Sequence, residues 1–132
     1  MLLVDTNVLV DVLQDDPKWA EWSIGQMRAQ AALHALVINP VIYAEMSLSF
    51  TTIEALDDVV QTLALDLREI PRPALFLAAK AYAQYRRRGG SKTQVLPDFF
   101  IGAHAAVEGW PLLTRDASRF RTYFPSVDVL AP

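Results

Sequence analysis

The fold is decided by the opening stretch Met1-Leu2-Leu3-Val4-Asp5-Thr6-Asn7, in which a short apolar run stops at an acid. A continuous apolar run of this length is typical of a strand that is buried on both faces of a parallel sheet. Thr6 or Asn7 can then cap a helix over residues 8–13, which the sequence Asp15-Asp16-Pro17 ends. A buried strand that leads directly into a helix predicts an α/β fold.

Short apolar strands and helices continue to alternate along the rest of the chain, without an internal repeat or a linker-like stretch. This pattern predicts a three-layer α/β sandwich, built as one domain over residues 1–132 around a parallel five-stranded sheet. The further strands are expected at residues 36–38, 67–70, 111–114 and 127–130. The further helices are expected to begin near Pro17 and to cover residues 41–50, 53–65, 73–88 and 97–108, with a short last helix capped by Asp116.

The composition suits a globular intracellular protein. Of the 132 residues, 52% are hydrophobic and 20% are charged, which is enough apolar surface for a substantial core. The absence of cysteine excludes disulfides and thiolate zinc sites and favours a cytoplasmic location. No apolar run approaches the roughly 20 residues that span a bilayer, and the N-terminus lacks a signal-like pattern. The net charge of -3 and the pI of about 5.2 argue against a protein that coats nucleic acid through bulk positive charge.

Four acids occupy positions from which they can converge when the chain folds. Asp5 and Asp116 each follow a predicted strand, and open parallel sheets gather their functional groups at the carboxyl ends of the strands. Glu45 is the only charged residue between positions 41 and 50. Asp98 lies in the first turn of a helix that is apolar almost all round and therefore largely buried. Buried carboxylates need partners, so these four predict a shared site.

Purely structural roles are the alternative for each acid. Asp5 also fits a turn, and Asp116 fits the N-cap of a short helix. The helix dipole favours Asp98 at a helix N-terminus by about 0.3–1 kcal/mol whatever its function. His104 follows Asp98 by six positions, about 240° around a helix, so the two cannot readily share a ligand. His104 and His34 are therefore expected to be structural, which disfavours a histidine-rich zinc centre.

A divalent cation would explain why these acids recur at such positions. Carboxylates within about 4–8 Å of one another repel by a few kcal/mol per close pair at an effective dielectric near 20. Mg²⁺ or Mn²⁺ prefers oxygen ligands, relieves this repulsion and leaves coordination sites for water and a phosphate oxygen. Such a site suits the hydrolysis of phosphodiester bonds, because the ion activates a water molecule and neutralises charge on the phosphate.

Four motifs resemble those of a PIN domain, most closely the VapC-type toxins, and the likeness covers essentially the whole chain. They are Val4-Asp5-Thr6-Asn7-Val8-Leu9, an isolated Glu45, Leu96-Pro97-Asp98-Phe99-Phe100-Ile101-Gly102-Ala103-His104-Ala105, and Leu113-Thr114-Arg115-Asp116. The resemblance implies a metal-dependent endoribonuclease that acts as the toxin of a type II toxin–antitoxin pair. It also implies a parallel sheet of order 3-2-1-4-5. It makes Asp5, Glu45, Asp98 and Asp116 the metal-binding catalytic acids, with Asn7 and Thr114 as polar supports.

The resemblance further implies partners. Family members usually form homodimers and are silenced by a small VapB-like antitoxin whose C-terminal segment lies across the active-site groove. Trp19, Trp22 and the helices around Val41 and Ile53 are candidate walls of that groove. For both tryptophans, ordinary core packing is an equal alternative.

A local basic patch is expected to hold the RNA on this acidic chain. The candidate RNA contacts are Arg87, Arg88, Lys92 and Arg115. For the arginines before Gly89-Gly90 there is also a structural reason, since cations near a helix C-terminus complement its dipole.

Two other classes of function share the expected architecture. Phosphoryl-transfer enzymes of the haloacid dehalogenase type need a second Asp two residues after the first, where this chain has Asn7, and response-regulator receivers need paired acids at the first strand. Neither pattern is present. A catalytically inactive binding module, in which the acids are only caps, is the non-enzymatic alternative.

Overall fold

The computed structural model describes residues 1–132 and contains one parallel sheet of five strands. The strands run in the order β3-β2-β1-β4-β5, so the central strand β1 pairs with β2 on one side and with β4 on the other. The expected fold class and strand order are confirmed. The strand bounds are β1 Leu2–Val4, β2 Leu36–Ile38, β3 Asp66–Leu67, β4 Leu112–Leu113 and β5 Val129–Leu130.

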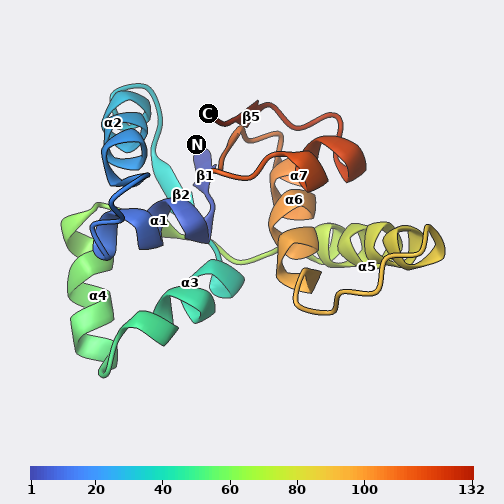
Figure 1. Ribbon diagram of the computed structural model, residues 1–132, viewed down its shortest axis with the longest axis horizontal. Coiled ribbons are helices and arrows are strands. Elements are labelled where there is room, and N and C mark those ends of the chain that lie inside the picture. Colours follow the sequence, from blue (N-terminus) through green and yellow to red (C-terminus); the bar gives the residue numbers. More distant parts are fainter.

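Seven α-helices flank the sheet. In Figure 1, α1, α2 and α4 lie to the left of β1, whereas α5, α6 and α7 lie to its right. No helix combines the length and the apolar character that a membrane-spanning segment needs. The helix bounds are α1 Thr6–Leu13, α2 Ala20–Ala31, α3 Pro40–Met46, α4 Ile53–Thr62, α5 Arg72–Arg87, α6 Leu96–Glu108 and α7 Ser118–Tyr123, with a 3-10 turn, η1, at Ser47–Ser49.

Several element bounds differ from the sequence prediction. The helix expected over 41–50 ends at Met46 and is followed by η1, the helix expected over 53–65 ends at Thr62, and the strand expected at 127–130 covers only Val129–Leu130.

Two further differences have a clear structural cause. The second helix begins at Ala20 rather than near Pro17, because the Asp16 side chain accepts hydrogen bonds from the backbone N–H groups of Lys18 and Trp19 and holds this segment as a turn. Strand β3 ends at Leu67 and does not reach residue 70. As an edge strand, β3 pairs only with β2, which ends at Ile38 opposite Leu67.

The N-cap predictions at two sites are wrong. Asp5, rather than Thr6 or Asn7, precedes α1 as its N-cap, and its side chain accepts a hydrogen bond from the Thr6 N–H. Asp116 does not cap α7, because the N-cap position falls on Ala117 and makes no side-chain cap bond. The structural explanation for Asp116 therefore fails, which leaves its carboxylate free for another role.

The core places the acid-bearing elements against one another. Strands β1, β2 and β4 are buried along their whole length, as continuous apolar strands should be. Helix α6 lies against α7 at Gly102, where a Cβ atom would collide with the Phe124 ring. Only glycine allows this approach, and it brings the first turn of α6 within reach of α7.

Candidate active site

The carboxyl ends of β1 and β4 bring Asp5 next to Thr114. The two strands pair in parallel with Val4 opposite Leu113, so the residues that follow them lie at the same edge of the sheet. The Asp5 N–H donates to the Leu113 carbonyl at 2.8 Å, and the Thr114 hydroxyl donates to Asp5 Oδ2 at 2.7 Å. Residues 109 positions apart are thus joined at the end of the central strand.

Asp5 is a buried carboxylate in an acidic environment. Its side chain has 4% exposure. Burial, together with the negative charges of Asp98 and Glu45, raises its pKa from 3.8 to about 7, although hydrogen bonds from Thr114 and Thr6 act in the opposite direction. The hydrogen bonds that Asp5 accepts therefore do not fully offset the free-energy cost of ionising its carboxyl group.

Glu45 reaches the same site from α3. Its Oε1 accepts a hydrogen bond of 2.6 Å from the Thr6 hydroxyl, and Thr6 follows Asp5 directly. Asn39 fixes the start of α3, because its side chain accepts from the Ile42 N–H as an N-cap. A capped, short helix thus presents Glu45 to the residue beside Asp5.

Asp98 lies in the first turn of α6 and is half-buried. Burial raises its pKa, and so do the charges of Glu45 and Asp116, whereas the guanidinium of Arg119 lowers it. Arg119 Nη1 lies 2.6 Å from Asp98 Oδ2. Each of the four acids therefore lies close enough to at least one of the others for their charges to interact.

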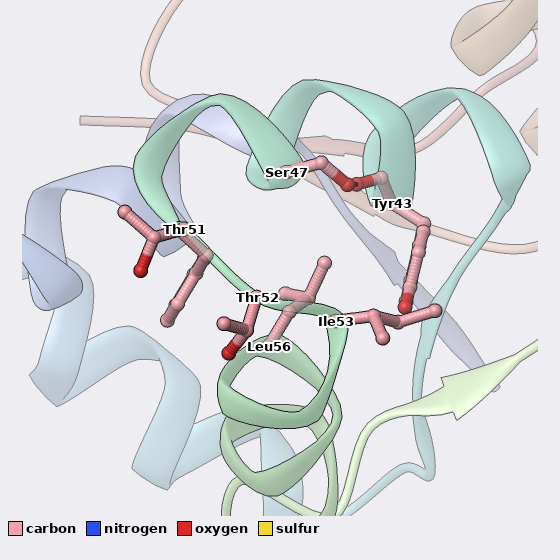
Figure 2. A pocket seen from close by; sticks show the side chains of 7 residues that line it. Tyr43, Ser47, Thr51, Thr52, Ile53 and Leu56 are labelled. Atoms are coloured by element: carbon pink, nitrogen blue, oxygen red, sulfur yellow. Dashed lines mark hydrogen bonds between the residues drawn. The ribbon is translucent and has the colours of Figure 1, made fainter.

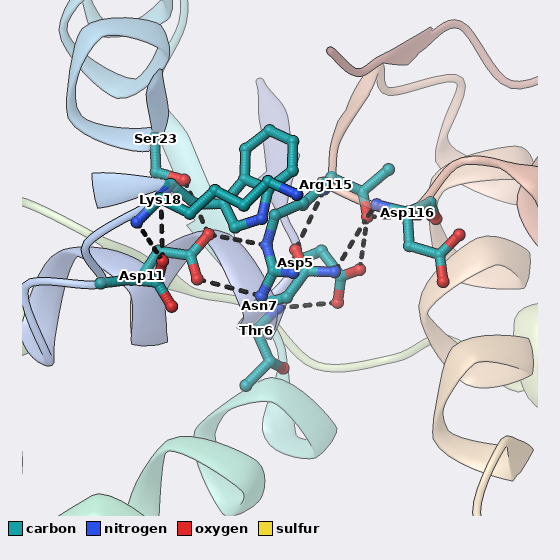
Figure 3. A network of polar contacts seen from close by, with 11 residues as sticks. Asp5, Thr6, Asn7, Asp11, Lys18, Ser23, Arg115 and Asp116 are labelled. Carbon is teal, nitrogen blue, oxygen red and sulfur yellow. Dashed lines mark hydrogen bonds and ion pairs between the residues drawn. The ribbon is translucent and has the colours of Figure 1, made fainter. Parts of the chain in front are cut away.

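Asp116, Asn7 and Thr114 are the other candidate site residues at the carboxyl ends of β1 and β4. The Asp116 side chain is exposed, and its backbone N–H donates to the Thr114 hydroxyl at 3.1 Å. The Asn7 side chain donates to the same hydroxyl at 3.4 Å and accepts from the Arg115 N–H at 3.1 Å. These hydrogen bonds tie the loop after β4 to the start of α1, and Figure 3 shows Asn7 in the same network of polar contacts as Asp5 and Arg115.

The expected close convergence of the acids occurs only in part. No group of three or more Asp, Glu, His or Cys side chains is arranged so that it could hold a metal ion as it stands. Three of the four carboxylates are turned to partners within the protein, Asp5 to Thr114, Glu45 to Thr6 and Asp98 to Arg119. The donor set is nevertheless chemically suited to a hard cation, because it consists of carboxylates and carries excess negative charge at buried Asp5.

Asp11 is an acid that the sequence interpretation did not include. Its carboxylate is 2% exposed and binds Arg115 through two hydrogen bonds, Nε to Oδ2 at 2.9 Å and Nη2 to Oδ1 at 3.0 Å. The Ser23 hydroxyl donates to Oδ2 at 3.0 Å. Figure 3 shows Arg115 reaching from the loop after β4 to Asp11. Asp11 is the only charged residue between positions 6 and 13, which is the same signal that singled out Glu45.

Arg115, a candidate RNA contact, has a structural role here. Besides its ion pair with Asp11, its guanidinium carbon lies 5.5 Å from the centroid of the Trp19 ring. The other three candidates, Arg87, Arg88 and Lys92, are exposed and form no ion pair with an acid of the chain. Arg87 lies in the last turn of α5, where it also complements the helix dipole.

A pocket of about 190 Å³ lies between α3 and α4 (Figure 2). It includes Ile53 from the helix expected to border a groove, and Leu48 is 90% exposed on the adjoining turn. Neither Trp19 nor Trp22 lines it, and Trp22 instead packs against the core. The lining residues are Tyr43, Ser47, Phe50, Thr51, Thr52, Ile53 and Leu56.

His104 is part of the core rather than of the acidic site. It is fully buried, its Nδ1 lies 3.2 Å from the Asn39 side-chain nitrogen, and burial lowers its pKa. The ring also packs against Trp110 with centroids 5.0 Å apart.

The buried Asp5 carboxylate makes the metal-free protein less stable at high pH. Because its pKa is about 7 in the folded chain and ordinarily 3.8, the folded state binds more protons between these values. Its contribution to stability is therefore greatest below pH 4 and is lost as the pH rises towards 7. In EDTA, the free energy of unfolding of the wild type relative to Asp5→Asn should fall by about 2–3 kcal/mol between pH 5 and pH 8.

Urea denaturation of both proteins at the two pH values measures this difference. Asp5→Asn cannot titrate at this position, so changes in other groups cancel in the comparison. An identical pH dependence in the two proteins would show that Asp5 is ionised without cost.

A parallel α/β sheet with one buried acid, and with further acids whose charges act on it, at the carboxyl end of its central strand defines an acid-lined α/β domain. The model of the PIN domain family matches residues 2–124, and the chain belongs to that family. The resemblance identified from the sequence motifs is confirmed.

Solved structures with the same fold come from toxin–antitoxin complexes. VapBC2 from Rickettsia felis, bound to a promoter DNA fragment, has a TM-score of 0.75 at 15% identity, with 99% of this chain and 98% of that chain covered. VapBC from Salmonella typhimurium, bound to DNA, has a TM-score of 0.71 at 18% identity, with 99% and 98% covered. A toxin–antitoxin complex from Klebsiella pneumoniae has a TM-score of 0.68 at 20% identity, with 98% and 96% covered. A search of curated proteins gave no significant match. These likenesses show that the chain shares the fold of those structures.

Proposed function

We propose that the protein is a divalent-metal-dependent endoribonuclease and the toxin of a type II toxin–antitoxin pair. The observation that carries this proposal is the buried Asp5 carboxylate at the end of the central strand, where the charges of Asp98 and Glu45 act on it. Membership of the PIN family and the toxin–antitoxin neighbours support it. We further propose that residues 1–132 function as one domain.

Asp5, Glu45, Asp98 and Asp116 would hold Mg²⁺ or Mn²⁺. When bound, the ion supplies positive charge that activates a water molecule and neutralises the phosphate as its bond to the leaving oxygen breaks. The chain's own contribution is to hold these acids together. The Thr114 hydroxyl orients Asp5, the Thr6 hydroxyl orients Glu45, and Asn7 fixes the loop that leads to Asp116.

RNA binding would use the exposed cations that have no acidic partner within the chain. Arg87, Arg88 and Lys92 meet this criterion, and Arg88 lies over the Tyr123 ring at 5.5 Å. Arg115 is less available, because Asp11 binds its guanidinium through two hydrogen bonds.

A VapB-like antitoxin is the proposed protein partner. The pocket between α3 and α4, together with exposed Leu48 and Ile53, provides an apolar surface for a segment of such a partner. We also propose a homodimer. Leu75 and Phe76, which are both exposed on α5, offer apolar side chains for that contact.

Cleavage of RNA by the purified, antitoxin-free protein tests the proposed function. We expect total RNA to be cut in Mg²⁺ or Mn²⁺ and to remain intact in EDTA, with activity restored when excess metal is added back. Mapping of the new 5′ ends would then identify the substrate RNA. Cleavage that continues unchanged in EDTA would reject the metal requirement. Intact RNA under every metal condition would favour an inactive binding module.

A further inference from the structure

Arg119 forms the only ion pair that any of the four acids makes within the chain. Its Nη1 lies 2.6 Å from Asp98 Oδ2 and joins α7 to the first turn of α6. The other two ion pairs of the protein, Arg68 with Asp66 and Arg115 with Asp11, lie outside this group. A single guanidinium is thus the internal counter-ion of the acidic site.

A divalent ion and this guanidinium would compete for the negative charge of Asp98. Arg119 occupies Oδ2 with a short, charge-assisted hydrogen bond, and its positive charge repels any cation that approaches the same carboxylate. The Asp98 side chain is 30% exposed and that of Arg119 is 24% exposed. Arg119 therefore has a route to solvent and can leave Asp98 without unpacking the core.

We propose that Arg119 is a positioning residue that holds Asp98 in the metal-free protein and must release it before the carboxylate binds a divalent ion. This inference rests on the proposed function, because it requires a metal ion among the four acids. It is consistent with the absence of a ready-made metal site, because the Asp98 carboxylate is turned to Arg119. Arg119 thereby lowers the affinity for metal and partly neutralises the negative charge of the acids in the metal-free protein.

The opposite role predicts the opposite result. If Arg119 instead held Asp98 in the orientation that the metal needs, as supporting residues around metal ligands often do, its removal would weaken metal binding. The sign of the change in affinity therefore separates competition from support.

Isothermal titration of the full-length, antitoxin-free protein with Mn²⁺ tests the proposal. We expect Arg119→Gln to bind Mn²⁺ about two- to tenfold more tightly than the wild type, the range for the loss of one partly buried ion pair. Arg121→Gln is the matched control, because Arg121 is exposed on the same helix and its replacement changes the net charge equally. Its affinity should stay within about twofold of the wild type, the scale of one screened surface charge.

Arg119→Lys provides a second variant with the charge retained. Its affinity should lie between those of the wild type and Arg119→Gln, and it remains informative if the glutamine variant folds poorly. Equal or weaker Mn²⁺ binding by Arg119→Gln, or an equal gain in Arg121→Gln, would overturn the proposal. If the wild type and all variants fail to bind Mn²⁺, the proposed metal-dependent function fails, and the role of Arg119 fails with it.

Discussion

Asp5→Asn should reduce RNA cleavage by at least about a thousandfold while the chain stays folded. Asparagine has nearly the same shape as aspartate, so the Thr6 N–H keeps its acceptor and the Thr114 hydroxyl keeps a polar partner. The substitution removes the buried negative charge that would attract the cation. Because that charge is costly in the metal-free protein, the variant should also be at least as stable as the wild type at pH 8 in EDTA.

Cleavage per folded molecule, measured at saturating Mn²⁺, gives the result. Asp98→Asn should behave in the same way, and both variants should relieve growth arrest when they are expressed in cells. Asp15→Asn is the control, because Asp15 is an exposed turn residue with a φ of 48°, a conformation that asparagine tolerates. Full activity in Asp5→Asn or Asp98→Asn, or an equal loss in Asp15→Asn, would contradict a catalytic role for these acids.

Asp11→Ala should destabilise the protein by about 3–5 kcal/mol, the usual cost of removing one partner from a buried ion pair. Asp11 receives two hydrogen bonds from Arg115 and one from Ser23, and all three donors would lose their acceptor. The partly buried position of Arg115 places the effect towards the lower end of that range.

Urea denaturation measures the loss, and Asp66→Ala is the matched control. Asp66 pairs with Arg68 at the surface, where both side chains are more than 40% exposed, so its removal should cost less than about 1 kcal/mol. If the two variants lost equal stability, the Asp11–Arg115 pair would not be the structural link that its burial indicates. Because Arg115 adjoins Asp116, we expect Asp11→Ala to lower cleavage as well.

The sheet could be predicted from the sequence because its strands are continuous apolar runs that end at polar residues. Leu2–Val4 and Leu36–Ile38 are buried along their whole length, as a continuous apolar run predicts. The prediction of edge strand β3 was less accurate, since half-buried Asp66 and exposed Leu67 give a weaker pattern than a buried strand and the strand's length depends on its neighbour β2. The start of α2 depended on hydrogen bonds to Asp16 that residue types alone do not specify.

The partial convergence of the candidate residues could be predicted from the sequence, but their side-chain contacts could not. Strand pairing brings Asp5 to Thr114, and the isolated charge at Glu45 identified the third segment. The partners Thr6 for Glu45 and Arg119 for Asp98 are set by packing between elements far apart in the sequence. Periodicity carries no information about such contacts. Asp11, like Glu45, is an isolated charged residue in an apolar stretch, and this pattern could have predicted that its carboxylate has a partner within the protein.

The location of a bound ion is the most direct measurement. In a crystal of the full-length protein soaked in Mn²⁺, the anomalous difference map should contain a manganese peak within coordination distance of Asp5 and at least one of Glu45, Asp98 and Asp116. Manganese only at surface positions away from Asp5, under conditions in which the protein cleaves RNA, would contradict a cation held by these acids.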